Sequence, residues 1–141
     1  MSHVTTIKFN GKWNLATLKA MCAAEGWDFI EGQKTFSWYG QHVGDYPLPD
    51  RFTQGDMGKC NHAINIPGAK YQIGVIEKEG KLHLLWDFYD AGGLQQALGK
   101  DAGLLTKAYT LAETRRKCHQ ARHRFKETRH EGHTEIRIPM N

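Results

Sequence analysis

Hydrophobic and polar residues alternate along several short segments of the chain, which is the pattern of strands in a sheet. β-Branched residues are frequent in the first of these segments, and turn signals separate the later ones. Glu79-Gly80 is predicted to join the last two segments as a hairpin. In the last segment, Leu85 faces away from its apolar neighbours, which predicts that this strand is covered on both sides. The alternating segments are residues 3–9, 60–66, 71–77 and 81–88.

Two segments have helical periodicity instead. Asn14 is the expected N-cap of a helix over residues 15–25, and Gly26 is the residue that ends it. A longer helix is predicted over residues 102–123, because apolar residues recur at helical spacing over its first three turns. After Ala112 the pattern becomes basic, so the last turns of this helix are expected to project beyond the core.

Two hairpins and one long loop complete the predicted elements. Aromatic residues and a central glycine favour a hairpin of residues 27–30 with 35–39. A terminal hairpin is predicted from residues 124–129 and 133–138. Residues from about 40 to 59 contain many Gly and Pro and no periodicity, which predicts an irregular loop of a length that is often functional.

The order of these elements predicts a single α+β domain over residues 1–141. Strands joined by short turns favour an antiparallel or mixed sheet, with the short N-terminal helix and the longer C-terminal helix on one face. A β-hairpin closes the chain.

Composition agrees with a soluble globular domain, with 40% hydrophobic and 24% charged residues. No apolar run approaches the roughly 20 residues of a membrane span, and the polar start lacks the apolar region of a signal peptide. Three widely spaced cysteines (Cys22, Cys60 and Cys118) do not form a disulfide framework. These features predict a cytoplasmic protein with no membrane partner.

Charge is distributed unevenly along the chain. Residues 1–105 contain ten Lys or Arg and eleven Asp or Glu, whereas residues 106–141 contain nine and four. A basic segment of this kind can neutralise nucleic-acid phosphates or an acidic partner surface, although solvated helix faces carry similar charge. The candidate contact residues are Arg115, Arg116, Lys117, His119, Arg122, His123, Arg124, Lys126 and Arg129.

One set of metal-competent residues is predicted to meet within the sheet. If the first strand and the strand over residues 60–66 are adjacent, His3, Cys60 and His62 converge on one inner face. Cys and His are ligands for zinc, and a Cys–His pair can also activate a thiolate nucleophile. The alternative is a partly buried polar cluster whose hydrogen bonds are satisfied within the sheet. His119 and His123 form a second pair at helical i,i+4 spacing.

Four segments of the sequence resemble a known protein family. They are MSHVTTIKF at the start, CNHAINIPGAKYQIGVI from Cys60, LLWDFYDAGGLQQALG from Leu84, and EIRI in the terminal hairpin. Together they resemble an uncharacterised family of small proteins from algal chloroplasts and cyanobacteria, whose members open with Met-Ser-His-Phe. Here Val4 stands in place of that Phe, and residues 115–123 contain more Arg and His than the resemblance leads us to expect. The resemblance implies an α+β fold, a soluble location and an accessory role, and it implies no reaction.

These observations favour a non-enzymatic accessory or adaptor protein that binds another macromolecule, most simply another protein. No set of residues suggests catalysis, so no catalytic residue is assigned, and no cofactor is expected unless zinc binds. The first alternative is nucleic-acid binding through the basic C-terminal helix. The second is zinc binding through His3, Cys60 and His62.

Overall fold

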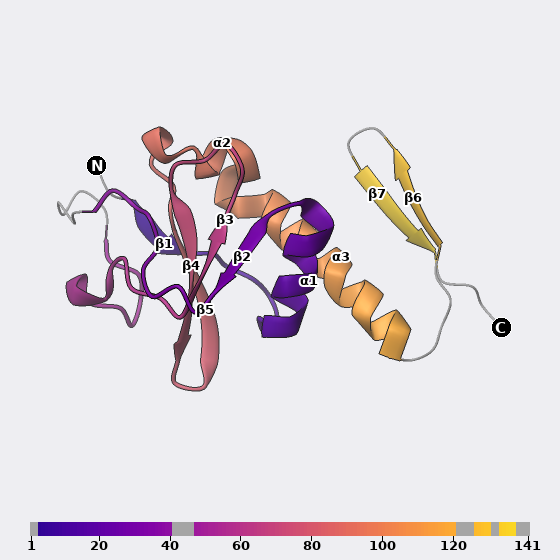
Figure 1. The fold of residues 1–141 in the computed structure, drawn as a ribbon, viewed down its shortest axis with the longest axis horizontal. Helices are drawn as coiled ribbons and strands as arrows, with labels where there is room; N and C mark the ends of the chain where they lie inside the picture. Colours follow the sequence, from indigo (N-terminus) through magenta and orange to yellow (C-terminus); the bar gives the residue numbers. More distant parts are fainter. Residues whose placement is uncertain (1–2, 41–46, 121–125, 131–132, 138–141) are drawn as a thin grey trace.

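In a computed structural model of the protein, five antiparallel strands form one sheet in the order β1-β5-β4-β3-β2 (Figure 1). The structure describes residues 3–40, 47–120, 126–130 and 133–137, the last two ranges for their backbone only. The strands are β1 (Val4–Thr6), β2 (Asp28–Glu31), β3 (His62–Asn65), β4 (Gln72–Lys78) and β5 (Lys81–Asp87). The helices are α1 (Leu15–Glu25), α2 (Leu94–Leu98) and α3 (Gly103–Gln120), with short 3-10 turns η1 (Gln54–Asp56), η2 (Asp90–Gly92) and η3 (Lys100–Ala102). The predicted α+β fold is confirmed.

Helix α1 begins and ends where the sequence predicts. The Oδ1 atom of Asn14 accepts a hydrogen bond from the backbone N–H of Thr17 at 3.1 Å, which satisfies one of the free donors of the first turn. Gly26 ends the helix in the left-handed conformation, with φ at 74°, where a side chain would be strained. Leu18, Met21 and Cys22 are buried on one face of α1.

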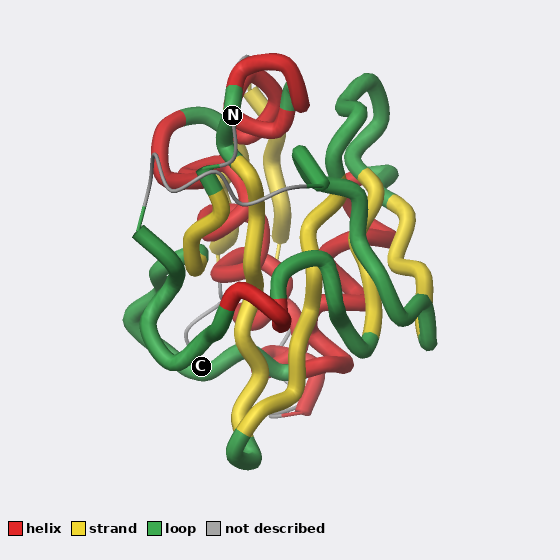
Figure 2. Tube along the Cα trace, turned by 90° about the vertical axis from the view of Figure 1, so that its left-hand side faces the viewer, coloured by secondary structure: helices red, strands yellow, loops and turns green. Residues whose placement is uncertain are grey.

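The sheet is covered on both faces, as Leu85 indicates. On one face, alternate strand residues such as Ile64, Val75 and Leu84 pack with buried residues of α1, α2 and α3 in the main core. On the other face, Leu85 and Ala63 pack with Phe36, Phe52 and other residues that lie outside the helices. Figure 2 shows loop segments passing over the strands on the side opposite the long helices.

The packing on the face of the sheet that carries Leu85, called the second face below, accounts for two departures from the sequence-based prediction. Residues 35–39 do not pair with residues 27–30; β2 pairs with β3 instead, and Thr35 forms an isolated bridge to Lys59. The long loop is not a free surface segment where it is described, because its Phe52 and Met57 are buried against the sheet. Residues 41–46 of that loop lie outside the described residues.

The terminal hairpin is confirmed and forms a sheet of its own. Strand β6 (Lys126–His130) pairs antiparallel with β7 (His133–Arg137), and neither strand joins the five-stranded sheet (Figure 1). The predicted end of the long helix, at residues 121–123, lies outside the described residues. In the part of the chain that the structure describes, no helix combines the length and apolar character that a membrane span requires.

Candidate functional site

His3 and His62 are not on neighbouring strands, so the predicted meeting of the candidate metal ligands is wrong. His3 directly precedes β1 and His62 begins β3, and strands β5 and β4 lie between them. Three strand spacings separate the two strands, which amounts to about 14 Å. Alternation indicates which face a side chain takes, but it contains no information about the order of strands in the sheet.

Each of the two histidines has its own local partners. The backbone N–H of Gly32 donates to Nδ1 of His62 at 3.0 Å, and the His62 ring lies 5.4 Å from the ring of Phe29. The His3 ring stacks on Phe88 at 5.1 Å and meets the edge of Tyr89 at 5.6 Å. His62 thus accepts a hydrogen bond within the fold, but the polar cluster of the alternative prediction does not form, because the two histidines lie on different strands.

The face predicted for Cys60 is also wrong, because Cys60 lies on the other side of the sheet from Ile64, in the second core cluster. It precedes β3, which begins at His62, so the strand alternation does not extend to it. Its thiol donates to the backbone carbonyl of Gln33, with 3.2 Å between the sulfur and oxygen atoms. Burial raises the pKa of the Cys60 thiol to about 11, which opposes the thiolate that nucleophilic catalysis needs. Among the described residues, no group of three or more His, Cys, Asp or Glu is placed to hold a metal ion.

We expect Cys60 to react slowly with a thiol reagent. The thiolate is the reactive species, and a pKa of about 11 in place of 9.0 leaves roughly a hundredfold less thiolate at pH 8. In a Cys22→Ala/Cys118→Ala variant, the rate of reaction with Ellman's reagent reports Cys60 alone. The folded variant should react about a hundredfold more slowly than the same variant in urea. Equal rates in the folded and the urea-unfolded variant would show that the fold does not suppress the Cys60 thiolate, and would support the hypothesis that Cys60 is a nucleophile.

Asp87 is the polar residue that the sequence analysis missed. It is fully buried at the end of β5, and its carboxylate accepts three backbone N–H groups. Oδ1 accepts from His3 at 2.9 Å and from Tyr89 at 3.1 Å, and Oδ2 accepts from Tyr39 at 3.0 Å. Burial, and then the nearby Asp87 carboxylate, raise the pKa of Tyr71. The carboxylate thus joins the start of β1, the end of β5 and the segment before the long loop.

The burial of Asp87 could have been predicted from the alternation of residues along β5. Leu85 predicts that β5 is covered on both faces, and Asp87 follows Leu85 by two residues, so the two side chains share the second face. A carboxylate on a covered face requires hydrogen-bond donors. The sequence does not indicate that these donors are the N–H groups of residues 3, 39 and 89.

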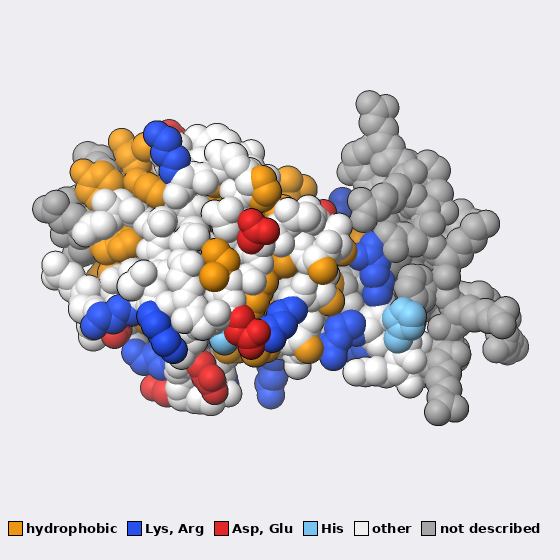
Figure 3. All heavy atoms as spheres, viewed as in Figure 1, with side chains coloured by type: hydrophobic (Ala, Val, Ile, Leu, Met, Phe, Trp, Pro, Cys, Tyr) orange, Lys and Arg blue, Asp and Glu red, His pale blue; other side chains and the backbone are white. Residues whose placement is uncertain are grey.

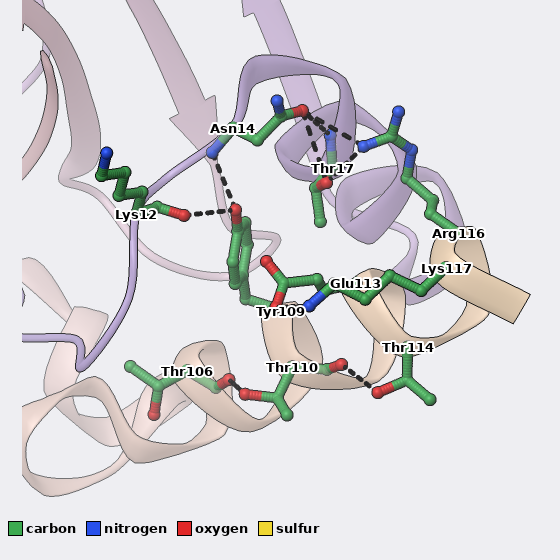
Figure 4. A network of polar contacts seen from close by, with 10 residues as sticks. All are labelled: Lys12, Asn14, Thr17, Thr106, Tyr109, Thr110, Glu113, Thr114, Arg116 and Lys117. Atoms are coloured by element: carbon green, nitrogen blue, oxygen red, sulfur yellow. Dashed lines mark hydrogen bonds and ion pairs between the residues drawn. The ribbon is translucent and has the colours of Figure 1, made fainter. Parts of the chain in front are cut away.

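Tyr109 and Arg116 attach α3 to the start of α1. The Tyr109 hydroxyl accepts from the backbone N–H of Asn14 at 2.7 Å and donates to the Lys12 carbonyl at 3.0 Å (Figure 4). One turn before the end of α3, the Arg116 guanidinium donates to Oγ1 of Thr17 at 2.6 Å and to Oδ1 of Asn14 at 3.2 Å. These contacts set the direction in which α3 leaves the sheet.

The structure describes only part of the predicted basic surface. Arg116 contributes to the contact between helices, and Lys117 pairs with Glu113 on the same helix at 3.3 Å. Arg115 and His119 lie on the last turns of α3, and Figure 3 shows Lys, Arg and His side chains together where α3 ends. Arg122, His123 and Arg124 lie outside the described residues. The predicted pairing of His119 with His123 therefore lies outside them too. For Lys126 and Arg129 the structure places only the backbone, in β6.

A comparison of the chain with protein-family models, curated proteins and solved structures finds no match. The resemblance of its opening and middle segments to the family from chloroplasts and cyanobacteria therefore stays a prediction. The function has to be inferred from the residues of this chain.

Proposed function

We propose that the protein is an accessory protein that binds nucleic acid through a basic C-terminal arm, residues 115–137. The observation that carries this proposal is a hairpin that follows α3 in the chain and forms its own two-stranded sheet. Residues 115–129, which end within β6, contain seven Lys or Arg and a single Glu. Phosphates are the partners that such a density of positive charge attracts most strongly.

The backbone register of the hairpin adds support. It places Lys126 opposite Arg137, two positively charged residues. Like charges directly across two strands destabilise a hairpin, and an isolated two-stranded hairpin is only marginally stable in water. A polyanion between these positions would relieve the repulsion, so binding would stabilise the arm.

Two observations bear on the other hypotheses. The long loop was one of the features that favoured a protein partner, beside the absence of a catalytic set and the family resemblance, and its Phe52 and Met57 cover the sheet. The zinc hypothesis required His3 and His62 to be adjacent, and two strands separate them. The basic arm is supported by its charge, and Arg116 and Tyr109 attach the helix that leads into it to the start of α1.

The test is a salt titration of binding to a labelled 20-base-pair duplex of arbitrary sequence, followed by fluorescence anisotropy. We expect tight binding at low salt and a logarithmic salt dependence with a slope of about −0.9 for each phosphate contacted. An Arg122→Glu/Arg124→Glu/Lys126→Glu variant should bind more weakly and lose at least about 2 units of slope, since three contacts are removed.

The matched control is Lys34→Glu/Lys59→Glu/Lys81→Glu, which changes three exposed lysines outside the arm by the same total charge. It should retain most of the affinity and the slope. The proposal fails if the wild-type protein does not bind the duplex at low salt, or if both triple variants weaken binding equally. It also fails if polyglutamate of equal charge competes as well as unlabelled duplex, because the arm would then recognise acidic chains in general.

A further inference from the structure

Strand β1 lies at an edge of the sheet and, among the residues that the structure describes, pairs on one side only, with β5. The N–H of Ile7 donates to the carbonyl of Leu84 at 2.8 Å, and the N–H of Phe88 donates to the carbonyl of His3 at 3.1 Å. In an antiparallel pair these bonds involve alternate residues, so the backbone N–H and C=O groups of Thr6 point away from β5. No other described residue forms a hydrogen bond with the backbone of Thr6.

A cavity of about 370 Å³ opens beside this free edge, between β1 and the α2–η3 segment. Its volume lies in the range of ligand pockets. Phe88 is partly exposed and supplies aromatic surface, with the nearly buried Trp86 beside it. Polar residues supply the rest of the lining, which consists of Thr5, Thr6, Lys8, Gln95, Lys100 and Asp101. An apolar side chain placed next to β1 would therefore meet aromatic rings, while its backbone lay beside the free groups of Thr6.

The edge carries an excess of lysines. Lys8 and Lys100 are both exposed and both line the cavity, against the single carboxylate of Asp101. Two further cavities also include Lys8, and they add three more lysines (Lys12, Lys81 and Lys107) and two more carboxylates (Glu77 and Glu79). The net positive charge along the edge is complementary to an acidic ligand.

We propose that β1 binds an extended acidic peptide from a partner protein, which adds a sixth strand to the sheet. Backbone hydrogen bonds to Thr6 supply affinity, an apolar side chain enters the cavity beside Trp86 and Phe88, and a neighbouring carboxylate lies between Lys8 and Lys100. Main-chain pairing with pockets for alternate side chains is the physical basis of strand addition to an exposed edge. A small anion would use the lysines but would leave the backbone groups of β1 unpaired.

This surface is separate from the basic arm. Lys100 lies in η3, just before α3, and the arm begins at Arg115 in the last turns of that helix, about 22 Å further along at 1.5 Å per residue. The two proposals are therefore independent, and together they describe an adaptor that holds a protein and a nucleic acid at opposite ends of one helix.

The test begins with selection of random octapeptides displayed on phage, using the full chain as bait. A Lys8→Glu/Lys100→Glu variant serves for counter-selection. We expect enrichment of peptides in which acidic and apolar residues alternate. A synthetic copy of an enriched peptide should bind the wild-type chain and lose roughly tenfold in affinity on the double variant, because its ion pairs are replaced by repulsion.

Thr6 provides a matched pair of variants for the backbone contact. Thr6→Pro removes the outward N–H and leaves the bonds between β1 and β5 in place, as proline at an edge position does. Thr6→Ala keeps that N–H. Proline should weaken peptide binding roughly tenfold, whereas alanine should leave it nearly unchanged. If Thr6→Pro does not fold, N-methylation of alternate peptide amides tests the same bonds from the other side.

Three results would overturn this proposal. One is failure to enrich any peptide over the counter-selection, and another is equal binding of enriched peptides to wild type, Thr6→Pro and Lys8→Glu/Lys100→Glu. The third is concentration-dependent self-association in analytical ultracentrifugation that Thr6→Pro abolishes, because the edge would then be occupied by a second copy of the chain. Duplex binding by the arm is unaffected in each case, so failure here leaves the proposed function intact.

Discussion

Replacing Asp87 with alanine is expected to lower the free energy of unfolding by about 3–4 kcal/mol. The side chain is fully buried, and its two oxygens accept N–H groups from residues 3, 39 and 89. Alanine would leave these three donors without an acceptor, and only backbone bonds such as that from Phe88 N–H to the His3 carbonyl would still join the start of β1 to the end of β5. Urea unfolding followed by circular dichroism measures the loss.

Two further variants distinguish the hydrogen bonds from general effects of the substitution. Asp90→Ala removes an exposed carboxylate three residues later and should change stability by no more than about 0.5 kcal/mol. Asp87→Asn should give an intermediate loss, because one oxygen can still accept two N–H groups while the amide nitrogen faces the third. Equal stability of Asp87→Ala and Asp90→Ala would contradict the assigned role.

Substitution of Gly74 by alanine should cost about 3 kcal/mol for a different reason. Gly74 lies on β4 between Ala63 and Leu85 in the register of the sheet, on the face that the loop covers. A methyl group at this position would overlap the ring of Phe36, which is itself buried. The ring would have to move, and it is held by the hydrogen bond from its own backbone N–H to the Gly58 carbonyl at 2.9 Å. Thermal and urea unfolding both report the change.

Gly103→Ala is the control for this prediction. Nothing lies within 4 Å of the position its methyl group would take, and its φ of −58° suits alanine. We expect a gain of about 0.5 kcal/mol there, because alanine reduces the freedom of the unfolded chain. In the Gly74→Ala/Phe36→Leu double variant, the loss should be smaller than the sum of the single losses. Strict additivity would show that the two positions do not share space.

Local features of the fold were predictable because local physics determines them. The bounds of α1 follow from Asn14 and Gly26, whose side-chain and backbone chemistry acts over three or four residues. The β4–β5 hairpin follows from alternation on both sides of Glu79-Gly80. The cover on both faces of β5 follows from Leu85 alone. In each case the residues that decide the structure are close together in the sequence.

Pairing between distant segments was not predictable in the same way. β2 pairs with β3 across more than thirty residues, although a hairpin with residues 35–39 would have been local. The reason is the second face of the sheet, where Phe36 fills the space that Gly74 leaves. A glycine within an alternating strand is visible in the sequence, but the aromatic residue that it accommodates is not.

The candidate sites show the same limit. The face of each histidine could be inferred from alternation, but their separation depends on strand order, which places β5 and β4 between them. Arg116 was predicted as part of a basic surface, and it is instead a partner of Asn14 and Thr17 on another helix. The free edge of β1 could be recognised only once the order of strands was known.

The position of β1 also affects the order in which the sheet can form. Val4 and Thr6 lie about eighty residues before their partners in β5, Asp87 and Leu85. Strands β3, β4 and β5, in contrast, are joined by short connections and can pair locally. Closing so long a loop comes at an entropic cost that the nearby pairings avoid. We therefore expect β1 to enter the sheet after β3, β4 and β5 have paired.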